Sequence, residues 1–424
     1  MRRVTGVVAA GAIVAASLVS VGSVTRAIAA VDGCANPAAV RVATGAELQQ
    51  ALSARVNGKV ICITADLALL GRGAASWTDF SLTIDGGGHR ITVDPQGAGM
   101  LFDLSGADAA TLTLANMEFV GDVMRNNNSI FHVQGDTSNR DNLVVSNVTF
   151  QGIRNFGSRP GVMGFGPAIY ATRLGQVDLE GVYVSDTLAQ SYAPVDISAS
   201  HIRVNASSFH RNRAVHDVLD LTSRSTCART EGGNMMGPRA GGASLVGGLS
   251  ITVTASIFWN NAAECGGALH VSDQITREAV DGQASITGSS IAYNEAYVLD
   301  GGGIVAERLA TLAVSGSGVL ANKAKRAGGG IDTSDVDTLT VSRSGVNFNA
   351  TETGDGGGIN ASSENAGSKV VIDTSIVRNN SAGFSGGGVA AEMGTVSLLA
   401  SRVSTNTALE GDGGGVYALE PDGA

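Results

Sequence analysis

Histidines, arginines and carboxylates gather in one short stretch of the chain. This candidate cluster consists of His210, Arg211, Arg213, His216, Asp217 and Asp220. A polysaccharide lyase needs a base, supplied by Arg, Lys or His, beside a group that neutralises the sugar carboxylate. A glycoside hydrolase needs two carboxylates about 5–10 Å apart. The stretch holds the residue types of either reaction and is therefore the candidate catalytic centre.

An insertion at about 223–248 follows the candidate cluster and carries Cys227, Arg229 and Glu231. A disulfide-held loop beside a charged stretch is typical of a binding or catalytic cleft. Charged residues beside an irregular turn are also typical of a solvated surface, and we favour this plainer interpretation.

The elements that must position these residues come from a repeat that is visible from about residue 110 onward. An apolar-x-apolar strand is followed by a Ser, then by an apolar anchor, and then by an Asn three residues after the anchor. The anchors are Phe119, Phe150, Val184, Phe209, Phe258, Ile291, Val319, Val346, Ile376 and Val403. The matching asparagines are Asn212, Asn261, Asn294, Asn322, Asn349, Asn379 and Asn406. The anchors recur every 25 to 34 residues, apart from one gap of 49 that holds the insertion, and this regularity predicts a solenoid.

Glycine accounts for 58 of the 424 residues, and part of this excess marks the repeats. Glycine pairs or triples follow the later asparagines; they begin at Gly266 (with Gly267), Gly301, Gly328, Gly356, Gly386 and Gly413. Gly permits positive φ and close backbone approach, and Asn tolerates the left-handed region while bonding to neighbouring backbone. We therefore interpret both motifs as structural.

Apolar residues alternate with period two in these repeats, and β-branched residues are frequent, so the segments are predicted strands. Because like segments recur one turn later, we expect them to stack in parallel. The prediction is an all-β, right-handed parallel β-helix of about 10–12 coils over residues 81–424. Two columns beside the glycine corners are expected to face outward as a generic surface: Val305, Asp332, Asn360, Ala390 and Tyr417, and Glu307, Ser334, Ser362, Glu392 and Leu419.

Residues 31–80 are predicted to form an N-terminal cap and a first coil. Thr44 and Glu47 have the spacing of a capping box that opens a short helix. Its apolar side consists of Leu48, Ala51, Leu52 and Val56. Such a helix would cover the open end of the stacked strands. Beyond the last strand the sequence shows no matching cap, so we expect that end to be truncated or to meet a partner.

Residues 1–30 are predicted to be a signal peptide. Arg2 and Arg3 precede an apolar run from 7 to 24, and a small-x-small pattern ends at Ala29. The expected location is therefore secreted or cell-surface, with no membrane span after cleavage. Removing three arginines leaves 25 cations against 38 acids, and 25 − 38 gives a net charge of −13. This charge argues against nucleic-acid binding and makes an anionic polysaccharide a poor ligand.

The four cysteines of an exported chain favour disulfides, and we expect the local pairs Cys34–Cys62 and Cys227–Cys265. Asp300, Asp355 and Asp412 precede glycine triples in alternate repeats, so no two neighbouring coils share a carboxylate site. We interpret them as turn caps, as we do Asp85. No metal site or cofactor is predicted; Ca²⁺ is expected only if the protein is a lyase.

Two local motifs resemble known families. Phe258-x-x-Asn261 followed by Gly266-Gly267-Ala268-Leu269 resembles the FxxN and GGA[ILV] motifs of polymorphic outer membrane proteins. The stretch from Ala46 to Ile63, with Leu82 to Gly88, resembles the entry of pectin-lyase-like right-handed β-helices. The resemblance covers most of residues 40–420. It implies a β-helix, with either surface adhesion or polysaccharide cleavage.

The chain departs from both families. It lacks the barrel strands with which polymorphic outer membrane proteins end, so their route of export is not implied. It also lacks an Asp-Asp pair and the NTD, GHG and RIK motifs of polygalacturonases. We therefore expect an exported, adhesin-like binding scaffold rather than an enzyme, with an extracellular glycan or cell-surface ligand as its partner. The alternative is a polysaccharide lyase or glycoside hydrolase centred on the candidate cluster.

Overall fold

The computed structural model describes residues 32–54, 56–69, 76–78, 81–93, 100–104, 109–121, 123–124, 129–136, 138–155, 168–190, 192–215, 240–273, 281–363, 368–392 and 394–419. They belong to one compact unit, Val31–Ala424. The predicted signal peptide lies outside the described residues. Within them the fold is all-β: strands account for nearly every element, and α1 is the one α-helix.

The unit begins with a 3-10 turn at Gly33–Ala35, strand β1 (Val40–Val42) and helix α1 (Gly45–Ser53). The first strands after it are β2 (Lys59–Ile63), β3 (Leu67–Leu69), β4 (Ser76–Thr78), β5 (Leu82–Asp85), β6 (Arg90–Val93) and β7 (Met100–Asp103). The middle of the unit contains β8 (Thr111–Gly121), β9 (Val123–Met124), β10 (Phe131–Gln134), β11 (Asn142–Gln151), β12 (Arg154–Asn155), β13 (Ile169–Glu180), β14 (Tyr183–Ser185), β15 (Leu188–Gln190), β16 (Val195–Asn205), β17 (Ser208–His210), β18 (Arg213–Val215), β19 (Ala243–Thr254), β20 (Ile257–Trp259) and β21 (Ala262–Ala263).

The remaining strands are β22 (Leu269–Ser272), β23 (Gln283–Thr287), β24 (Ser290–Ala292), β25 (Glu295–Ala296), β26 (Ile304–Ser315), β27 (Gly318–Leu320), β28 (Lys323–Ala324), β29 (Ile331–Ser342), β30 (Gly345–Asn347), β31 (Ala350–Thr351), β32 (Ile359–Ser362), β33 (Ser368–Asp373), β34 (Ile376–Arg378), β35 (Ser381–Ala382), β36 (Val389–Glu392), β37 (Gly394–Leu399), β38 (Arg402–Ser404), β39 (Thr407–Ala408) and β40 (Val416–Leu419).

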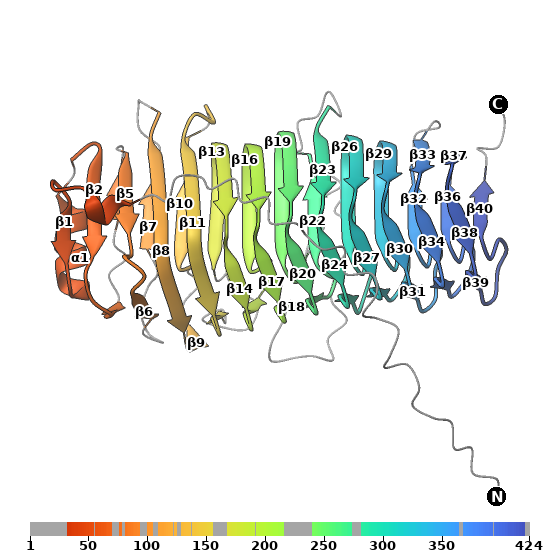
Figure 1. The fold of residues 1–424 in the computed structure, drawn as a ribbon, viewed down its shortest axis with the longest axis horizontal. Coiled ribbons are helices and arrows are strands. Elements are labelled where there is room, and N and C mark those ends of the chain that lie inside the picture. Colours follow the sequence, from red (N-terminus) through yellow and green to blue (C-terminus); the bar gives the residue numbers. More distant parts are fainter. Residues whose placement is uncertain are drawn as a thin grey trace, which may run out of the picture. The chain divides into compact units, whose positions relative to one another are not determined.

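These strands pair in parallel with their counterparts one repeat later, and we call one repeat a coil. In β26 and β29, for example, Ile304 pairs with Ile331 and Ser315 pairs with Ser342. A separate sheet of ten short strands runs from β9 to β39 in the same order. Figure 1 shows the coils following one another in sequence order toward β40. The predicted parallel stacking of like segments is therefore confirmed.

The apolar anchors form one continuous column in the core. Phe150 pairs with Phe119 and Val184, and the column continues through Phe209 and Phe258. One predicted anchor was wrong. Val377 occupies the column, pairing with Val346 and Val403, whereas Ile376 is 44% exposed.

The same one-residue shift corrects the predicted asparagine. The side chains that stack are Asn212, Asn261, Asn294, Asn322, Asn349, Asn380 and Asn406, which we call the asparagine stack. Asn379 instead takes the turn position before it, with φ of 55°. In the sequence Ile376 is followed by Val377 and Asn379 by Asn380, so either member of each pair fits the repeat pattern. Only the pairing of the backbone between coils shows which member occupies the column.

Each stacked asparagine satisfies several buried groups at once. The Oδ1 of Asn322 accepts hydrogen bonds from the backbone N of Asn294 at 3.0 Å and from its Nδ2 at 2.8 Å. The Nδ2 of Asn322 donates to the carbonyl oxygen of Ile291 and to the Oδ1 of Asn349. Serines do the same at the preceding turn, where the backbone N of Ser289 donates to the Oγ of Ser317 at 3.1 Å. The predicted bonding of Asn to backbone is confirmed, and the bonds run from coil to coil.

The glycine corners are needed for two distinct reasons. Gly328 has φ of 62°, in the left-handed region that side chains disfavour. At Gly329 a Cβ atom would collide with the carbonyl oxygen of Gly357 in the next coil. The first glycine of a triple therefore makes the turn, and the second lets the coils approach.

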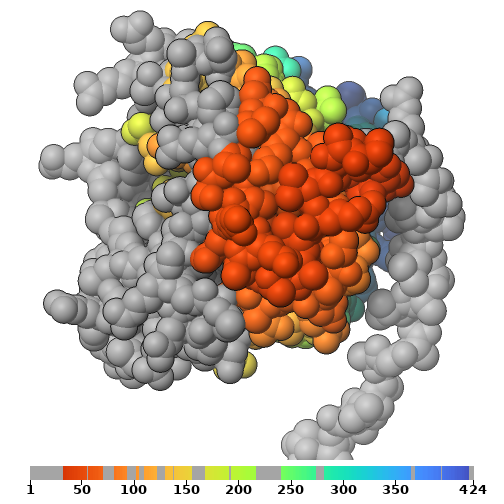
Figure 2. All heavy atoms as spheres, turned by 90° about the vertical axis from the view of Figure 1, so that its left-hand side faces the viewer, coloured from red at the N-terminus to blue at the C-terminus, as the bar shows by residue number. Residues whose placement is uncertain are grey.

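The N-terminal cap forms as predicted, with one exception. The Oγ1 of Thr44 accepts a hydrogen bond from the backbone N of Glu47, whose carboxylate accepts one from the N of Thr44. Leu48 and Leu52 are buried beneath the helix, but Val56 lies beyond its end and is exposed. Figure 2 looks onto this end, where the cap residues cover the strands behind them.

The predicted Cys34–Cys62 disulfide is confirmed and joins the cap to β2. Cys265 is also disulfide-bonded, and its predicted partner Cys227 lies outside the described residues. The predicted insertion is shorter than expected, because residues 243–248 belong to β19, where Ala243 pairs with Val195. No helix in the described ranges is long and apolar enough to cross a membrane.

We predict that Asn322→Ala lowers the free energy of unfolding by about 2–5 kcal/mol, because two donors of Asn294 lose their buried acceptor. Asn347→Ala is the matched control. Asn347 is half-buried on β30 and lies outside the stack, so its loss should change stability by about 0.5 kcal/mol or less. Urea unfolding measures both values, and equal losses would contradict a special role for the stack.

Candidate functional site

The predicted catalytic cluster divides between described and undescribed residues. His210 ends β17, Arg211 occupies the turn after it, and Arg213 begins β18. His216, Asp217 and Asp220 lie outside the described residues.

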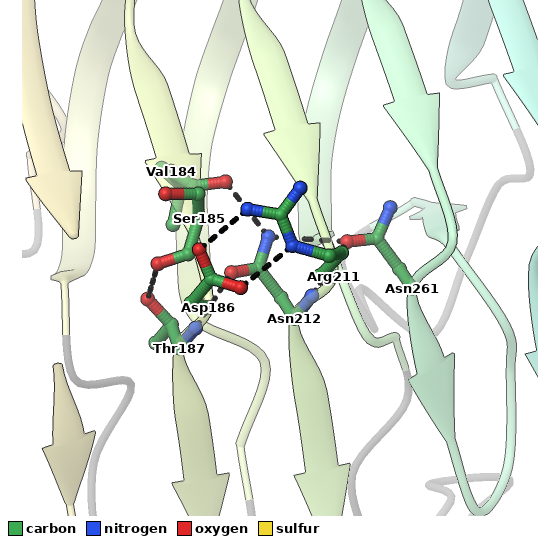
Figure 3. A network of polar contacts seen from close by, with 7 residues as sticks. All are labelled: Val184, Ser185, Asp186, Thr187, Arg211, Asn212 and Asn261. Atoms are coloured by element: carbon green, nitrogen blue, oxygen red, sulfur yellow. Dashed lines mark hydrogen bonds and ion pairs between the residues drawn. The ribbon is translucent and has the colours of Figure 1, made fainter. Parts of the chain in front are cut away.

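Arg211 is engaged in a structural ion pair. Its Nε and Nη2 each donate to a carboxylate oxygen of Asp186 in the preceding coil, both at 2.7 Å (Figure 3). Both residues have φ above 50° and stand at the same turn position of neighbouring coils. The hydrogen bond from Arg211 holds the pKa of Asp186 below its ordinary value. The guanidinium charge is thus matched within the protein.

The turn that carries Arg211 is held by the asparagine stack. Asn212 donates from Nδ2 to the carbonyl oxygen of Val184 and to the Oδ1 of Asn261 (Figure 3). Its own Oδ1 accepts the backbone N–H of Thr187 at 3.0 Å. Neighbouring coils therefore fix the backbone between His210 and Arg213, and this part of the cluster supports the turn interpretation.

His210 belongs to a different kind of arrangement, which the sequence analysis missed. Its ring stacks on Tyr183 with centroids 5.4 Å apart and planes at 29°. On its other side lies Trp259 at 6.1 Å, and Trp259 meets Tyr293 edge to face at 6.4 Å. We call these four residues, Tyr183, His210, Trp259 and Tyr293, the aromatic strip.

The aromatic strip is exposed and crosses four successive coils. The exposed fractions are 36% for Tyr183, 37% for Trp259 and 47% for Tyr293, and His210 is half-buried. Burial is the main cause that lowers the pKa of His210, and the charge of Arg211 lowers it further. Both effects favour the neutral imidazole, which packs as one more flat ring.

A sequence signal for the strip existed. Tyr183, His210 and Trp259 each stand next to a buried anchor, where alternation along a strand turns a side chain outward. Tyr293 stands two residues after its anchor, in the turn. Aligning the anchors coil by coil would have placed His210 beside Trp259, with Tyr183 and Tyr293 at neighbouring positions of the adjacent coils.

A second arrangement contradicts the predicted generic surface beside the glycine corners. Val305 and Ala390 are fully buried, and Asp332 and Asn360 are nearly so. The register confirms that these residues align, and it extends the column back through His270 and Ser244. The column is therefore a buried strip of the protein and not a solvated face.

Polar side chains in this region form two sets of contacts. The Nδ1 of buried His270 lies 3.2 Å from the Oγ of Ser244, and its Nε2 lies 3.2 Å from the Oε2 of Glu307. Farther along, the Nδ2 of Asn360 donates to Asp332 at 2.8 Å. We call Ser244, His270, Glu307, Asp332 and Asn360 the polar column, although Glu307 stands two positions beyond the others, opposite Ser272. A histidine between a hydroxyl and a carboxylate has the components of acid–base chemistry, and the sequence analysis did not single it out.

The aspartates before the glycine triples bind backbone rather than each other. The Oδ1 of Asp300 accepts the backbone N–H of Ala327, and Asp355 accepts that of Ser385, each in the next coil. Asp85 accepts from the backbone N of Cys34 and of Gly87. Within the described ranges, no group of three or more His, Cys, Asp or Glu side chains is placed to hold a metal ion.

Comparison with known proteins adds little to this geometry. No family model matches the chain, and no curated protein matches it. A solved structure described as "L. reuters 100-23 SRRP" aligns over 90% of this chain and 98% of its own length. Its sequence identity is 14% and its TM-score is 0.33, so it supports no conclusion about this chain.

We predict that Asp186→Asn makes stability less dependent on pH in acid. Because folding lowers the pKa of Asp186, the wild-type pair stabilises the fold above about pH 4, the unfolded-state value, and loses this contribution as the pH falls through the folded-state pKa. The side chains are partly exposed, so the effect should stay below about 1 kcal/mol.

A double-mutant cycle with Arg211→Gln, followed by urea unfolding at pH 6 and at pH 3, measures this contribution. Coupling between the two positions should be present at pH 6 and reduced at pH 3. Absence of coupling at pH 6 would show that the pair is not structural.

Proposed function

We propose that this chain is an exported binding scaffold, adhesin-like in character, that acts outside the cell or at its surface. Its stacked coils would form a right-handed parallel β-helix of the pectin-lyase-like type. The proposed partner is an extracellular glycan or another cell-surface ligand, and the ligand would contact the aromatic strip.

The observation that carries this proposal is the exposure of the strip. Aromatic rings bury large apolar areas when they pack in a core, yet three of these rings expose a third to a half of their surface. Contiguous exposed apolar patches on soluble proteins mark interaction sites. The described backbone on which these side chains stand is fixed by neighbouring coils, so the rings are presented without a large ordering cost.

The charges of the described turn support binding rather than catalysis. Arg211, the cation nearest to His210 in sequence, is paired with Asp186. His210 is held between two aromatic rings, and burial lowers its pKa. Neither residue is placed like the base of a lyase, which must reach a substrate proton.

We predict that Trp259→Ala weakens binding to the target surface by about tenfold or more, which corresponds to about 1.4 kcal/mol. Phe384→Ala is the matched control, because Phe384 is an exposed aromatic residue outside the strip. Binding of the purified chain to intact cells and to a panel of immobilised polysaccharides measures the effect. Binding that is lost equally in both variants, or in neither, would refute the role of the strip.

The alternative function is a carbohydrate-active enzyme, and the polar column is the observation that favours it. His270 contacts Ser244 and Glu307 through its two ring nitrogens, and Asp332 lies in the same column. An enzyme of this kind would use His270 as an acid or base and Glu307 to orient it.

Under this alternative, His270→Ala would abolish turnover of pectate, alginate or a neutral polysaccharide, assayed with and without Ca²⁺. Unsaturated-product absorbance detects a lyase, and new reducing ends detect a hydrolase. Because His270 is fully buried, far-ultraviolet circular dichroism must show that the variant folds. Turnover by the wild type that is lost in a folded variant would establish the enzyme, and no turnover on any of these polymers would exclude these substrates.

A further inference from the structure

We propose that the aromatic strip binds a neutral polysaccharide whose chain crosses the four coils obliquely along the strip, with about one sugar ring for each aromatic ring. This inference rests on the proposed binding function and assigns its ligand class and orientation. Three features of the described residues support it: the spacing of the rings, the balance of charge beside them, and the polar groups at their edges.

The rings come from four successive coils but not from one column. Tyr183, His210 and Trp259 come from β14, β17 and β20, which pair in that order, and Tyr293 follows β24, the next strand in the same ladder. Tyr183 pairs with Ser208 and so stands two positions before the column of His210 and Trp259, whereas Tyr293 stands one position after it. The centroid separations of 5.4, 6.1 and 6.4 Å are similar to one another. They are also comparable with the length of one sugar unit in an extended chain, so an extended polymer that follows the strip obliquely across the coils can pass one ring per sugar.

The ring orientations leave surface for a ligand. The plane of Trp259 is turned by 48° from His210 and by 71° from Tyr293, so neither neighbour covers the indole face to face. The C–H groups of a sugar ring are apolar and can pack on an aromatic face, while its hydroxyls point outward. Trp259, as the largest ring, is the expected centre of the site.

Charge favours a neutral chain. The chain without residues 1–30 has 25 cations and 38 acids, 25 − 38 giving −13, and it would repel a polyanion. Arg211 beside the strip is already neutralised by Asp186, with two hydrogen bonds of 2.7 Å. An acidic sugar would have to break this pair to obtain a counter-charge there.

Uncharged polar groups line the strip. Asn260 follows Trp259 and is exposed, and Ser208 and Ser290 are half-buried on the strands that carry or precede the rings. Amides and hydroxyls both donate and accept, as sugar hydroxyls do. These groups can orient a neutral sugar without a charged partner.

The strip also has defined ends. Thr149 pairs with Tyr183 on one side, and Ala321 occupies the turn position of Tyr293 in the following coil. Neither presents a ring. Affinity should therefore increase with chain length until four rings are covered and then stay constant.

Isothermal titration of the full chain with cello-, manno- and xylo-oligosaccharides of two to six units tests this inference. For at least one series we expect the dissociation constant to fall about tenfold or more between the dimer and the tetramer and to change less than about twofold beyond it. Tyr183→Ala and Tyr293→Ala should weaken tetramer binding more than dimer binding. Trp259→Ala should weaken both, and Phe384→Ala should weaken neither. Oligogalacturonides of the same lengths serve as the acidic comparison.

The outcomes separate this inference from the proposed function. If Trp259→Ala abolishes attachment to cells but no neutral oligosaccharide binds, or if acidic oligomers bind more tightly, the strip is a binding surface and the neutral-glycan inference is wrong. If affinity does not depend on chain length, the proposed orientation is wrong. If the strip variants bind cells and every oligosaccharide with the affinity of the wild type, the proposed function of the strip is also wrong.

Discussion

Backbone hydrogen bonding between successive coils is the constraint on which the other features depend. In a stack of parallel strands each ladder bond joins one coil to the next, and the turns between strands would leave buried N–H and C=O groups without partners. The asparagine stack and the serines before it supply those partners. Asn322, for example, accepts two bonds from Asn294 and donates two others. In the coils from Asn212 to Asn406, one asparagine per coil therefore supplies the buried hydrogen bonds of this turn.

The same constraint determines how the surface is organised. Because the register keeps equivalent positions aligned, an outward side chain in one coil contacts its equivalent in the next. Phe209 and Phe258 meet this way inside the core, and His210 and Trp259 meet this way outside it. Single substitutions in neighbouring repeats can thus assemble an extended binding surface without any change in the backbone. On another part of the coil His270 instead contacts Glu307, which stands two positions beyond its equivalent Val305.

Much of the fold followed from residue spacing. The anchors, the glycine corners, the capping box and the Cys34–Cys62 bridge are local signals, and the structure contains each of them. The errors occurred where a local pattern fits two registers or where exposure depends on other parts of the chain. Ile376 and Asn379 were assigned one residue too early, and Val305 and Ala390 are buried rather than exposed. The candidate site was predicted least well, because charged residues drew attention to Arg211, which serves the turn.

By itself the sequence determined where the chain turns and which side chains enter the core. Both follow from local backbone preferences and from alternation along a strand, and they recur often enough in 424 residues to be recognised. Only the tertiary structure decided which outward residues become neighbours. Tyr183 and Tyr293 are far apart in sequence and join one strip because the stacking of four coils brings them beside His210 and Trp259, although they stand at other positions of the coil. Register is set by the pairing of strands between coils, so the sequence of a single segment does not determine it.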